Sequence, residues 1–460
     1  MKKKPNIVYV FADQLRYMSV GCCGNKQVQT PNMDLLAAEG IVMDQAFSSC
    51  PICSPYRAQI LTGLYAHQNG VVCNEYEMRH DVPTLPQCLH ENGYYTAYIG
   101  KWHLGYGPYT PDKRYGFDYM AATNMPKDSF SGIYYMNEEG PYELGKDWLP
   151  CEETDMCIDF LHKHQQERGD QPFMVMMSWI PPHWPYTTLP DRYNLYRPED
   201  IDLPANIPEQ MAEFEKKETA LYYGNITGLD DQLGRLMREI DNMGLTEDTI
   251  FCFSSDHGDH LGAHGFGKPR DHWLHHSKRG SKATPYEESV HIPFIIRWPG
   301  HIQAGSRSDV MFNSVDVMPT LLKMSGAALH DTLAGQDLSF AMLGEKGQGP
   351  DSVFFQILGQ GWPHRGPWLG YWRGVRTLRY VYARWYDEDL QPVLFDRQND
   401  PLEMENCYGK EAYADVQQEM ERLLQEWLEK TQDPFDTGER DPHTNMLCLG
   451  QKFTHEKWNR

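Results

Sequence analysis

The chain has 460 residues, of which 40% are hydrophobic and 23% are charged. This composition is typical of a globular protein rather than a disordered one, and the length favours more than one domain. The formal net charge of −22 argues against general nucleic-acid binding, which needs a basic face, but it allows a local cationic pocket for a small anion.

The N-terminal segment MKKKPNIVYVFADQLR superficially resembles an export signal, because three lysines precede an apolar run. The run over residues 7–12 is shorter than the apolar core of such a signal, and it ends at Asp13 without a small-residue cleavage pattern. No stretch approaches the ~20 apolar residues of a membrane span. Eleven irregularly spaced cysteines favour reduced thiols over a secreted disulfide framework. We therefore expect a cytoplasmic protein with no membrane partner.

Continuous apolar runs predict buried strands, because strands covered on both faces lack a polar alternation. These runs lie at residues 7–12, 94–99, 173–179, 249–254 and 294–298. Helical patterns lie between them, at residues 32–39, after Pro55, and at 84–92, 154–166 and 209–242. Strands that alternate with helices predict an α/β fold with a large, mostly parallel sheet flanked by helices.

The pattern changes near residue 345, where GEKGQGPDS is typical of a linker. Antiparallel strands without crossover helices are predicted at residues 353–358, 374–384 and 392–395. An amphipathic helix is expected over residues 410–431, with one apolar side formed by Val416, Met420, Leu423, Leu424 and Trp427. We therefore expect a catalytic domain over residues 1–345, a smaller α+β subdomain over 346–432 and a tail over 433–460.

Polar side chains follow four of the predicted strands at the point where each strand ends. The groups are Asp13-Gln14, Lys101-Trp102-His103, His183 and Asp256-His257. Because open parallel sheets bind ligands at the carboxyl ends of their strands, we expect these groups to meet in one site.

The residue types in these groups favour a divalent cation beside an anion pocket. Asp13 and Asp256 offer carboxylates, Gln14 a carbonyl oxygen and His257 a nitrogen. Hard cations prefer oxygen ligands, while an imidazole shifts the preference towards Mn²⁺. The cationic or hydrogen-bond-donating side chains Arg57, Lys101, His103 and His183 suit a tetrahedral oxyanion such as sulfate or phosphate.

The segment SSCPICSPYRAQILTGLYAHQ, residues 48–68, contains two cysteines. Cys50 and Cys53 have the spacing of a redox pair, although a redox pair belongs in a short thioredoxin-like unit that the surroundings do not resemble. The alternative is that Cys53 alone is functional, since Pro55 and Arg57 follow it at the start of a helical pattern.

CSPYR, residues 53–57, fits the Cys-x-Pro-x-Arg signature of type I sulfatases in the alkaline phosphatase superfamily, and the sequence resembles that family over residues 5–408. Further motifs occur in the family order: RAQILTGLYAHQNGV, GKWHLG, PPHWPY, SSDHGDHLGAHG, KATPYEESVHIPFIIRWPG, NSVDVMPTLLKMSG and VLFDRQNDPLEMEN. The resemblance implies an alkaline-phosphatase-like fold, with a large mixed, mostly parallel sheet flanked by helices and a smaller C-terminal α+β subdomain. It also implies that a maturase oxidises Cys53 to formylglycine, which makes Cys50 incidental.

The resemblance further assigns roles within the expected site. Arg57 and Lys101 would hold the formylglycine hydrate, His103 would act as the base for sulfate release and His183 as the general acid, and Lys282 would bind sulfate. The metal would be held by Asp13, Gln14, residue 53, Asp256 and His257.

Two departures from the family pattern leave alternatives open. Many members carry two adjacent aspartates where this chain has Asp13-Gln14, and asparagine in place of His257. The combination also resembles phosphonate monoester and phosphodiester hydrolases. One fewer carboxylate weakens the preference for Ca²⁺, which stays the expected ion while Mn²⁺ and Mg²⁺ remain open. The segment 269–281 is inserted before Lys282, so that Lys268 is a second candidate for the sulfate-binding lysine.

The inserted segment has two interpretations. It can be a solvated surface loop, or a specificity loop in which Trp273 stacks on a sugar while Arg270 and His272 bind an anionic group. Overall we expect a sulfuric ester hydrolase that acts on a small sulfated sugar or related organic sulfate. The alternatives are a phosphonate monoester or phosphodiester hydrolase and an inactive member that only binds anionic glycans.

Overall fold

A computed structural model describes residues 3–266, 282–359 and 371–440 of the chain. The main feature is a ten-stranded sheet with the strand order β11-β2-β10-β9-β1-β8-β4-β5-β6-β7. The bounds of these strands are β1 Asn6–Asp13, β2 Ile41–Met43, β4 Tyr95–Lys101, β5 Tyr119–Thr123, β6 Gly132–Met136, β7 Glu139–Leu144, β8 Phe173–Pro182, β9 Thr249–Ser255, β10 Phe294–Arg297 and β11 Ser306–Ser308. A separate small sheet pairs β3 Ala46–Phe47 with β12 Phe312–Asn313.

The centre of the large sheet is parallel. Strand β1 runs parallel to β8 on one side and to β9 on the other, and β4 runs parallel to β8 and β5. In this register Ala12 of β1 lies beside Ser255 of β9, and Phe11 lies beside Ser178 of β8. The carboxyl ends of the central strands therefore meet at one edge of the sheet, where ligands bind in open α/β folds.

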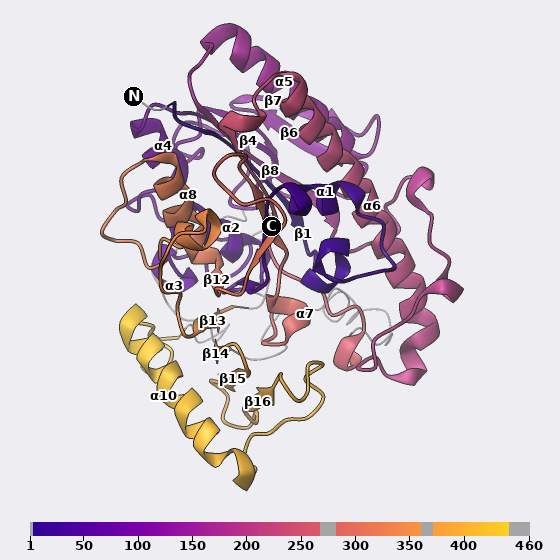
Figure 1. Cartoon of the computed structure of the whole chain (residues 1–460), viewed down its shortest axis with the longest axis vertical. Coiled ribbons are helices and arrows are strands. Elements are labelled where there is room, and N and C mark those ends of the chain that lie inside the picture. The colour runs from indigo at the N-terminus through magenta and orange to yellow at the C-terminus, as the bar shows by residue number, and fades with distance from the viewer. Residues whose placement is uncertain (1–2, 267–281, 360–370, 441–460) are drawn as a thin grey trace, which may run out of the picture.

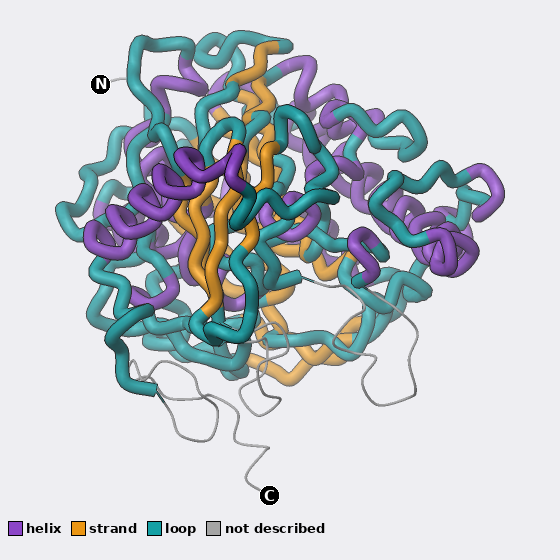
Figure 2. The backbone as a smooth tube through the Cα atoms, turned by 90° about the horizontal axis from the view of Figure 1, so that it is seen from below, coloured by secondary structure: helices purple, strands orange, loops and turns teal. Residues whose placement is uncertain are grey.

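Helices cover both faces of the sheet (Figures 1 and 2). On one face the core of Ile7, Tyr9 and Phe11 extends to α2, α4 and α8, and on the other face Val8 and Val10 pack towards α1, α5 and α6. The bounds are α1 Pro31–Glu39, α2 Cys53–Thr62, α3 Ala66–Asn69, α4 Leu85–Glu91, α5 Leu149–Arg168, α6 Ala212–Asn242, α7 Glu287–Val290, α8 Val317–Ser325 and α9 Ser339–Leu343. Burial on both faces explains why the strand sequences are apolar throughout.

The predicted fold class is confirmed, and every strand and helix expected before residue 300 is present with shifted ends. Helix α5 begins at Leu149, five residues earlier than expected, because Pro150 fits the first helical turn. Strands β5, β6 and β7 were not predicted from the sequence; β5 is mostly buried, β6 partly buried and β7 largely exposed. Strand β10 pairs antiparallel with β9, which makes the large sheet mixed rather than wholly parallel.

The C-terminal part contains a four-stranded antiparallel sheet in the order β13-β14-β15-β16. Its strands are β13 Val353–Ile357, β14 Trp372–Arg376, β15 Tyr380–Trp385 and β16 Val393–Asp396. The prediction of one strand over residues 374–384 is wrong, because the chain reverses between β14 and β15. The Thr377 hydroxyl group accepts a hydrogen bond from the Tyr380 amide at 2.9 Å and so closes a turn that lacks glycine, proline and asparagine.

Helix α10, Ala414–Thr431, packs on the small sheet through Met420, Leu424 and Leu428 (Figure 1). Beyond the helix, Asp433 forms a buried ion pair with Arg373 at 2.7 Å, so that the described start of the expected tail packs against the sheet. One hydrophobic core joins this sheet to residues of the first part such as Phe47. The proposed domain boundary near residue 345 stays a prediction.

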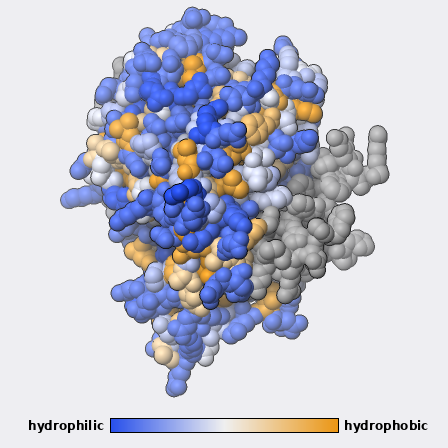
Figure 3. Space-filling model, turned by 90° about the vertical axis from the view of Figure 1, so that its right-hand side faces the viewer, coloured by the Kyte–Doolittle hydropathy of each residue, from blue (hydrophilic) through white to orange (hydrophobic). Residues whose placement is uncertain are grey.

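One face of the molecule is largely polar. On the face shown in Figure 3, hydrophilic side chains dominate and hydrophobic ones are scattered among them. Exposed large hydrophobic side chains include Leu195, Leu378 and Met404, which come from separate parts of the chain. None of the helices in the described ranges combines the length and the apolar character that a membrane span requires.

A buried charge network fastens the C-terminal sheet to the first part of the chain. Glu287 at the start of α7 accepts a hydrogen bond from Arg376 of β14 at 2.7 Å, and it lies 3.3 Å from Arg397 and 2.9 Å from His291. Burial alone would raise the pKa of Glu287, but these three neighbours lower it well below its ordinary value. The carboxylate is therefore charged and is the shared partner of two guanidinium groups and an imidazole.

Replacing Glu287→Gln should lower the free energy of unfolding by about 3–5 kcal/mol, because it leaves buried guanidinium groups without their anion. Denaturant-induced unfolding measures this change. The control is Asp200→Asn, which breaks the exposed pair of Arg197 and Asp200 and should have little effect. Equal effects of the two substitutions would contradict the role of Glu287 in joining the two sheets.

Candidate active site

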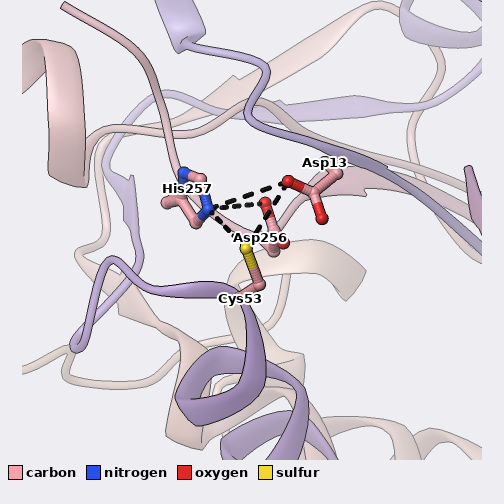
Figure 4. Close-up of side chains that lie close together, drawn as sticks. All are labelled: Asp13, Cys53, Asp256 and His257. Carbon is pink, nitrogen blue, oxygen red and sulfur yellow. Dashed lines mark hydrogen bonds and ion pairs between the residues drawn. The ribbon is translucent and has the colours of Figure 1, made fainter. Parts of the chain in front are cut away.

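Polar residues at the ends of β1 and β9 meet beside Cys53 in one cluster (Figure 4). Lys101 at the end of β4 contacts Asp13 of this cluster, and the charge of His183 after β8 acts on the same carboxylate. Asp13 is the last residue of β1 and Lys101 the last residue of β4, while His183 directly follows β8. Asp256 and His257 directly follow β9. Parallel pairing of these strands explains the convergence, because it places all of their carboxyl ends at the same edge.

Cys53 enters this cluster from the opposite direction. It is the first residue of α2, it is buried, and its Sγ lies 3.3 Å from His257 Nε2 and 3.6 Å from Asp13 Oδ1. Residue 53 thus stands where the partial positive charge of a helix N-terminus faces the strand ends.

The carboxylate of Asp13 is held between two buried cations. Lys101 Nζ lies 2.6 Å and Arg57 Nη2 lies 3.0 Å from Asp13 Oδ2. Burial alone would raise the pKa of Asp13, but Lys101, His183, Lys282 and Arg57 lower it well below its ordinary value. The carboxylate is therefore ionised in the folded protein.

Arg57 also fixes its surroundings. Its Nη2 lies 3.4 Å from Asp256 Oδ2, and its Nη1 donates to the hydroxyl group of Ser178 at 2.6 Å and to the Lys101 carbonyl at 2.6 Å. The sequence interpretation did not include Ser178, although a serine inside the otherwise apolar strand FMVMMSWIPP was a usable signal. The guanidinium group faces both aspartates, and its contact with the nucleophile stays a prediction.

Asp256 and His257 complete the donor set. His257 Nδ1 donates to the Gly258 carbonyl at 2.9 Å, which turns Nε2 towards Cys53 and Asp256. Burial and the neighbouring Asp13 carboxylate raise the pKa of Asp256 to about 7. Two carboxylates this close favour a positive charge between them.

The cluster is suited to a cation. One ligand atom from each of Asp13, Cys53, Asp256 and His257 lies within 4.8 Å of the others. The ammonium group of Lys282 lies at the rim of this set, 3.0 Å from Cys53 Sγ, 3.2 Å from His257 Nε2 and 3.3 Å from Gln14 Oε1. An ammonium group thus already lies beside these donors, which indicates that they favour a positive charge.

The pKa values of the two neighbouring cysteines, Cys50 and Cys53, are shifted in opposite directions. Burial and Asp13 act to raise the pKa of Cys53, but Lys101, Lys282 and His257 lower it well below its ordinary value. Burial raises the pKa of Cys50. Both thiols are free rather than joined in a disulfide. A reactive redox pair needs an accessible thiol of low pKa, so the buried Cys50 does not support that interpretation.

The two predicted catalytic histidines have different neighbours, and their catalytic roles stay predictions. His183 Nδ1 donates to the Trp184 carbonyl at 2.5 Å, and burial and Lys282 lower its pKa to about 3. His103 has a left-handed backbone with φ 56°, and its Nε2 lies 3.5 Å from Glu75 Oε1. Backbone strain of this kind gathers at functional sites. Glu75 was not identified from the sequence, since no motif surrounds it.

Four sequence candidates lie outside the described residues. They are Lys268, Arg270, His272 and Trp273, all within or beside the inserted segment. Their proposed contacts with substrate therefore stay predictions, whereas Lys282, the other candidate lysine, lies beside Cys53.

Comparison with known proteins shows what this chain is similar to. A family model described as Sulfatase matches residues 5–327, and a model described as N-sulphoglucosamine sulphohydrolase, C-terminal, matches residues 278–430. An ulvan-active sulfatase from Formosa agariphila is 32% identical over 440 residues, which are 94% of this chain and 82% of that protein. An endo-4-O-sulfatase from Bacteroides thetaiotaomicron is 28% identical over 92% of both chains. The crystal structure of a YidJ sulfatase from Bacteroides fragilis superposes with a TM-score of 0.82 at 30% identity, over 95% of this chain and 98% of that one.

Gly100 directly precedes Lys101 in β4 and lies close to the backbone of β8. This close approach of the two strands can be tested. Its φ is +103°, and a Cβ atom there would lie 2.1 Å from the Ser178 carbonyl oxygen. Gly93 has φ +83° with no atom within 4 Å of the same position. Gly100→Ala should therefore lower the free energy of unfolding by at least about 2 kcal/mol more than Gly93→Ala, because steric overlap adds to backbone strain. Urea unfolding of both variants measures the difference, and equal losses would contradict the close approach of β4 and β8.

Proposed function

The chain belongs to the sulfatase family and is a sulfuric ester hydrolase, and on that premise we propose that it removes sulfate from a small sulfated carbohydrate. The similar proteins from Formosa agariphila and Bacteroides thetaiotaomicron are named for action on ulvan and as an endo-4-O-sulfatase, which supports a sugar substrate. The observation that carries the proposal is the position of Cys53, whose Sγ lies within 3.6 Å of His257, Asp13 and Lys282.

The proposed nucleophile is formylglycine made from Cys53 by a formylglycine-generating maturase. An aldehyde hydrate carries two hydroxyl groups, of which one can attack sulfur and the other can then lose its proton and expel sulfate. A bare thiol has no comparable route to release a sulfated product. The surrounding cations lower the pKa of Cys53, so they favour negative charge at this position and suit a deprotonated hydroxyl group of the hydrate.

The proposed cation site consists of Asp13, Gln14, residue 53, Asp256 and His257. Three of these groups offer oxygen atoms, which favours Ca²⁺, and the His257 nitrogen leaves Mn²⁺ or Mg²⁺ as alternatives. A cation there would lower the pKa of a hydroxyl group held against it and neutralise negative charge on the sulfate.

The other side chains have proposed roles that follow from their contacts. Lys101 and Arg57 hold the Asp13 carboxylate in its ionised form. Lys282 presents a buried ammonium group 3.0 Å from residue 53 and would bind the sulfate oxygens. His103 would accept the proton that leaves when sulfate is released, and His183 would protonate the leaving alkoxide.

The proton on His183 depends on the substrate. With a pKa of about 3, the His183 ring is neutral near pH 7 in the free protein. Lys282 is a cause of this low pKa, and a sulfate anion bound to Lys282 would offset its charge. A nearby anion favours the protonated ring, so binding of substrate would raise the pKa of His183 towards the range that a general acid needs.

A phosphonate monoester or phosphodiester hydrolase is the second candidate function. The observation in its favour is the combination of Asp13-Gln14 with Asp256-His257, which resembles the pattern of those hydrolases. An inactive protein that only binds anionic glycans is the third candidate, and it would follow if Cys53 remained a thiol.

Mass spectrometry and activity of the full chain, produced together with the maturase, separate these candidates. We expect the peptide that contains residue 53 to lose about 18 Da on conversion of the thiol to the aldehyde. The protein should then hydrolyse sulfated monosaccharides faster than aryl phosphonates or phosphodiesters. Cys53→Ala should lower turnover by more than about a thousandfold, whereas Cys50→Ala should retain it. An unconverted Cys53 in active protein would contradict the proposed nucleophile.

Two lysine variants test the proposed sulfate contact. Lys282→Ala should lower kcat/KM by about 10²–10³-fold, because it removes a preorganised positive charge from the reacting sulfate. Lys268→Ala is the matched control, since the sequence alone allowed either lysine to fill this role. Steady-state kinetics on one sulfated monosaccharide measures both variants. A larger loss in Lys268→Ala would show that the wrong lysine has been assigned.

A further inference from the structure

The side-chain amide of Gln14 lies between an anion and a cation. Its Nε2 donates to Asp259 Oδ2 at 2.6 Å, and its Oε1 accepts from Lys282 Nζ at 3.3 Å. Neither the sulfatase resemblance nor the similar proteins assign a role to Asp259, which lies three residues beyond Asp256. Gln14 and Asp259 are both buried, so their contact is shielded from water.

The chemistry of these two neighbours fixes which way the amide points. A carboxylate can only accept a hydrogen bond, and an ammonium group can only donate one. The nitrogen of Gln14 must therefore face Asp259 and its oxygen must face Lys282. This orientation directs the amide oxygen towards the side of the cluster where Cys53 and His257 also contact Lys282.

Asp259 is itself held rigidly. Its Oδ1 accepts from the Leu261 amide at 2.9 Å, and its Oδ2 accepts from the Tyr186 hydroxyl group as well as from Gln14. No freedom remains for the carboxylate to turn away from Gln14, because each of its oxygens already has a donor among the described residues.

The backbone of Gln14 is held as firmly as its side chain. The Gln14 amide donates to Asp256 Oδ1 at 2.9 Å, and the Gln14 carbonyl accepts from the Tyr222 hydroxyl group at 2.6 Å. These bonds keep residue 14 at φ 72°, a left-handed conformation that a side chain other than glycine's rarely adopts. Strained backbone that the surroundings over-determine is typical of a functional position.

We propose that Asp259 is a positioning residue, which binds the amide nitrogen of Gln14 and so directs the Gln14 oxygen into the cation cluster. Because Asp259 is an aspartate, it also requires an uncharged side chain at position 14. The inference rests on the proposed function only in that the cluster holds a cation. It explains why this chain has Gln14 where many family members carry a second aspartate. An acidic side chain at position 14 would place two buried carboxylates side by side.

The closest substitution for Asp259 should already disturb the site. In Asp259→Asn, the amide oxygen is needed to accept from Leu261, so the new amide nitrogen faces Gln14. Gln14 must then turn its own oxygen to that nitrogen and present its nitrogen to the cluster. An amide nitrogen that faces the cluster in place of the amide oxygen cannot bind a cation. We therefore expect Ca²⁺ binding to weaken by about 10–100-fold, the usual effect of losing a group that orients a metal ligand.

Adding Gln14→Glu to Asp259→Asn should restore binding. One oxygen of the carboxylate introduced at position 14 can accept from the new amide nitrogen while the other faces the cluster, so the acidic and amide side chains have exchanged places. We expect Ca²⁺ affinity in the double variant to return to within about threefold of the wild type, a large departure from additivity.

The experiment is calorimetric titration of CaCl₂, with MnCl₂ in parallel, into the chelator-treated full chain. Asp230→Asn is the matched control, because Asp230 is a buried aspartate that accepts hydrogen bonds from Asn32 and Met33 away from the cluster. It should lose stability but keep its Ca²⁺ affinity.

Three results would overturn the inference: unchanged Ca²⁺ affinity in Asp259→Asn, no recovery in the double variant, or no cation binding by the wild type. Hydrolysis of a sulfate ester is measured separately on the same proteins. A wild type that binds Ca²⁺ but hydrolyses no sulfate ester would refute the proposed function and leave the Asp259 inference intact. A wild type that hydrolyses a sulfate ester, with additive effects of the two substitutions on Ca²⁺ affinity, would support the proposed function and refute the Asp259 inference.

Discussion

The site depends on the buried carboxylate of Asp13, which Lys101 and Arg57 hold in its charged form. An isolated buried anion is strongly unfavourable, and two close cations are what make this one tolerable. Each of these three residues comes from a different element, namely β1, β4 and α2. The charge interaction therefore ties together the elements that carry residue 53 and the candidate cation ligands, and loss of Asp13 would take a buried carboxylate away from both cations at once.

The parallel sheet makes this arrangement possible. Its central strands end at one edge, and the N-terminus of α2 meets that edge with residue 53 in the lead. Apolar residues on both faces of β1 anchor the sheet between helices, so the polar residues just beyond the strand have little freedom to move. Positive and negative side chains both surround residue 53, so that one small volume would accommodate the proposed cation, nucleophile and sulfate anion without a large net charge.

The sequence was informative where residue type alone determines behaviour. Continuous apolar runs identified the central strands, and the polar residues after them identified Asp13, Lys101, Asp256 and His257. The sequence carried no signal for features that depend on residues far apart in the chain or that lack an apolar pattern. The orientation of Gln14 needs Asp259, the hairpin after Arg376 turns without a glycine, and β7 has no buried face to give it a pattern. The cytoplasmic location and the roles of Arg270, His272 and Trp273 remain predictions from sequence.

Anomalous X-ray diffraction from crystals of the full chain grown with Mn²⁺ tests the central claim most directly. The account predicts one strong anomalous peak among Asp13, Gln14, Asp256 and His257, at about 2.0–2.6 Å from their oxygen and nitrogen atoms and adjacent to residue 53. A peak at another place, or none in crystals that diffract well, would contradict the view that these strand ends form a cation site beside the nucleophile.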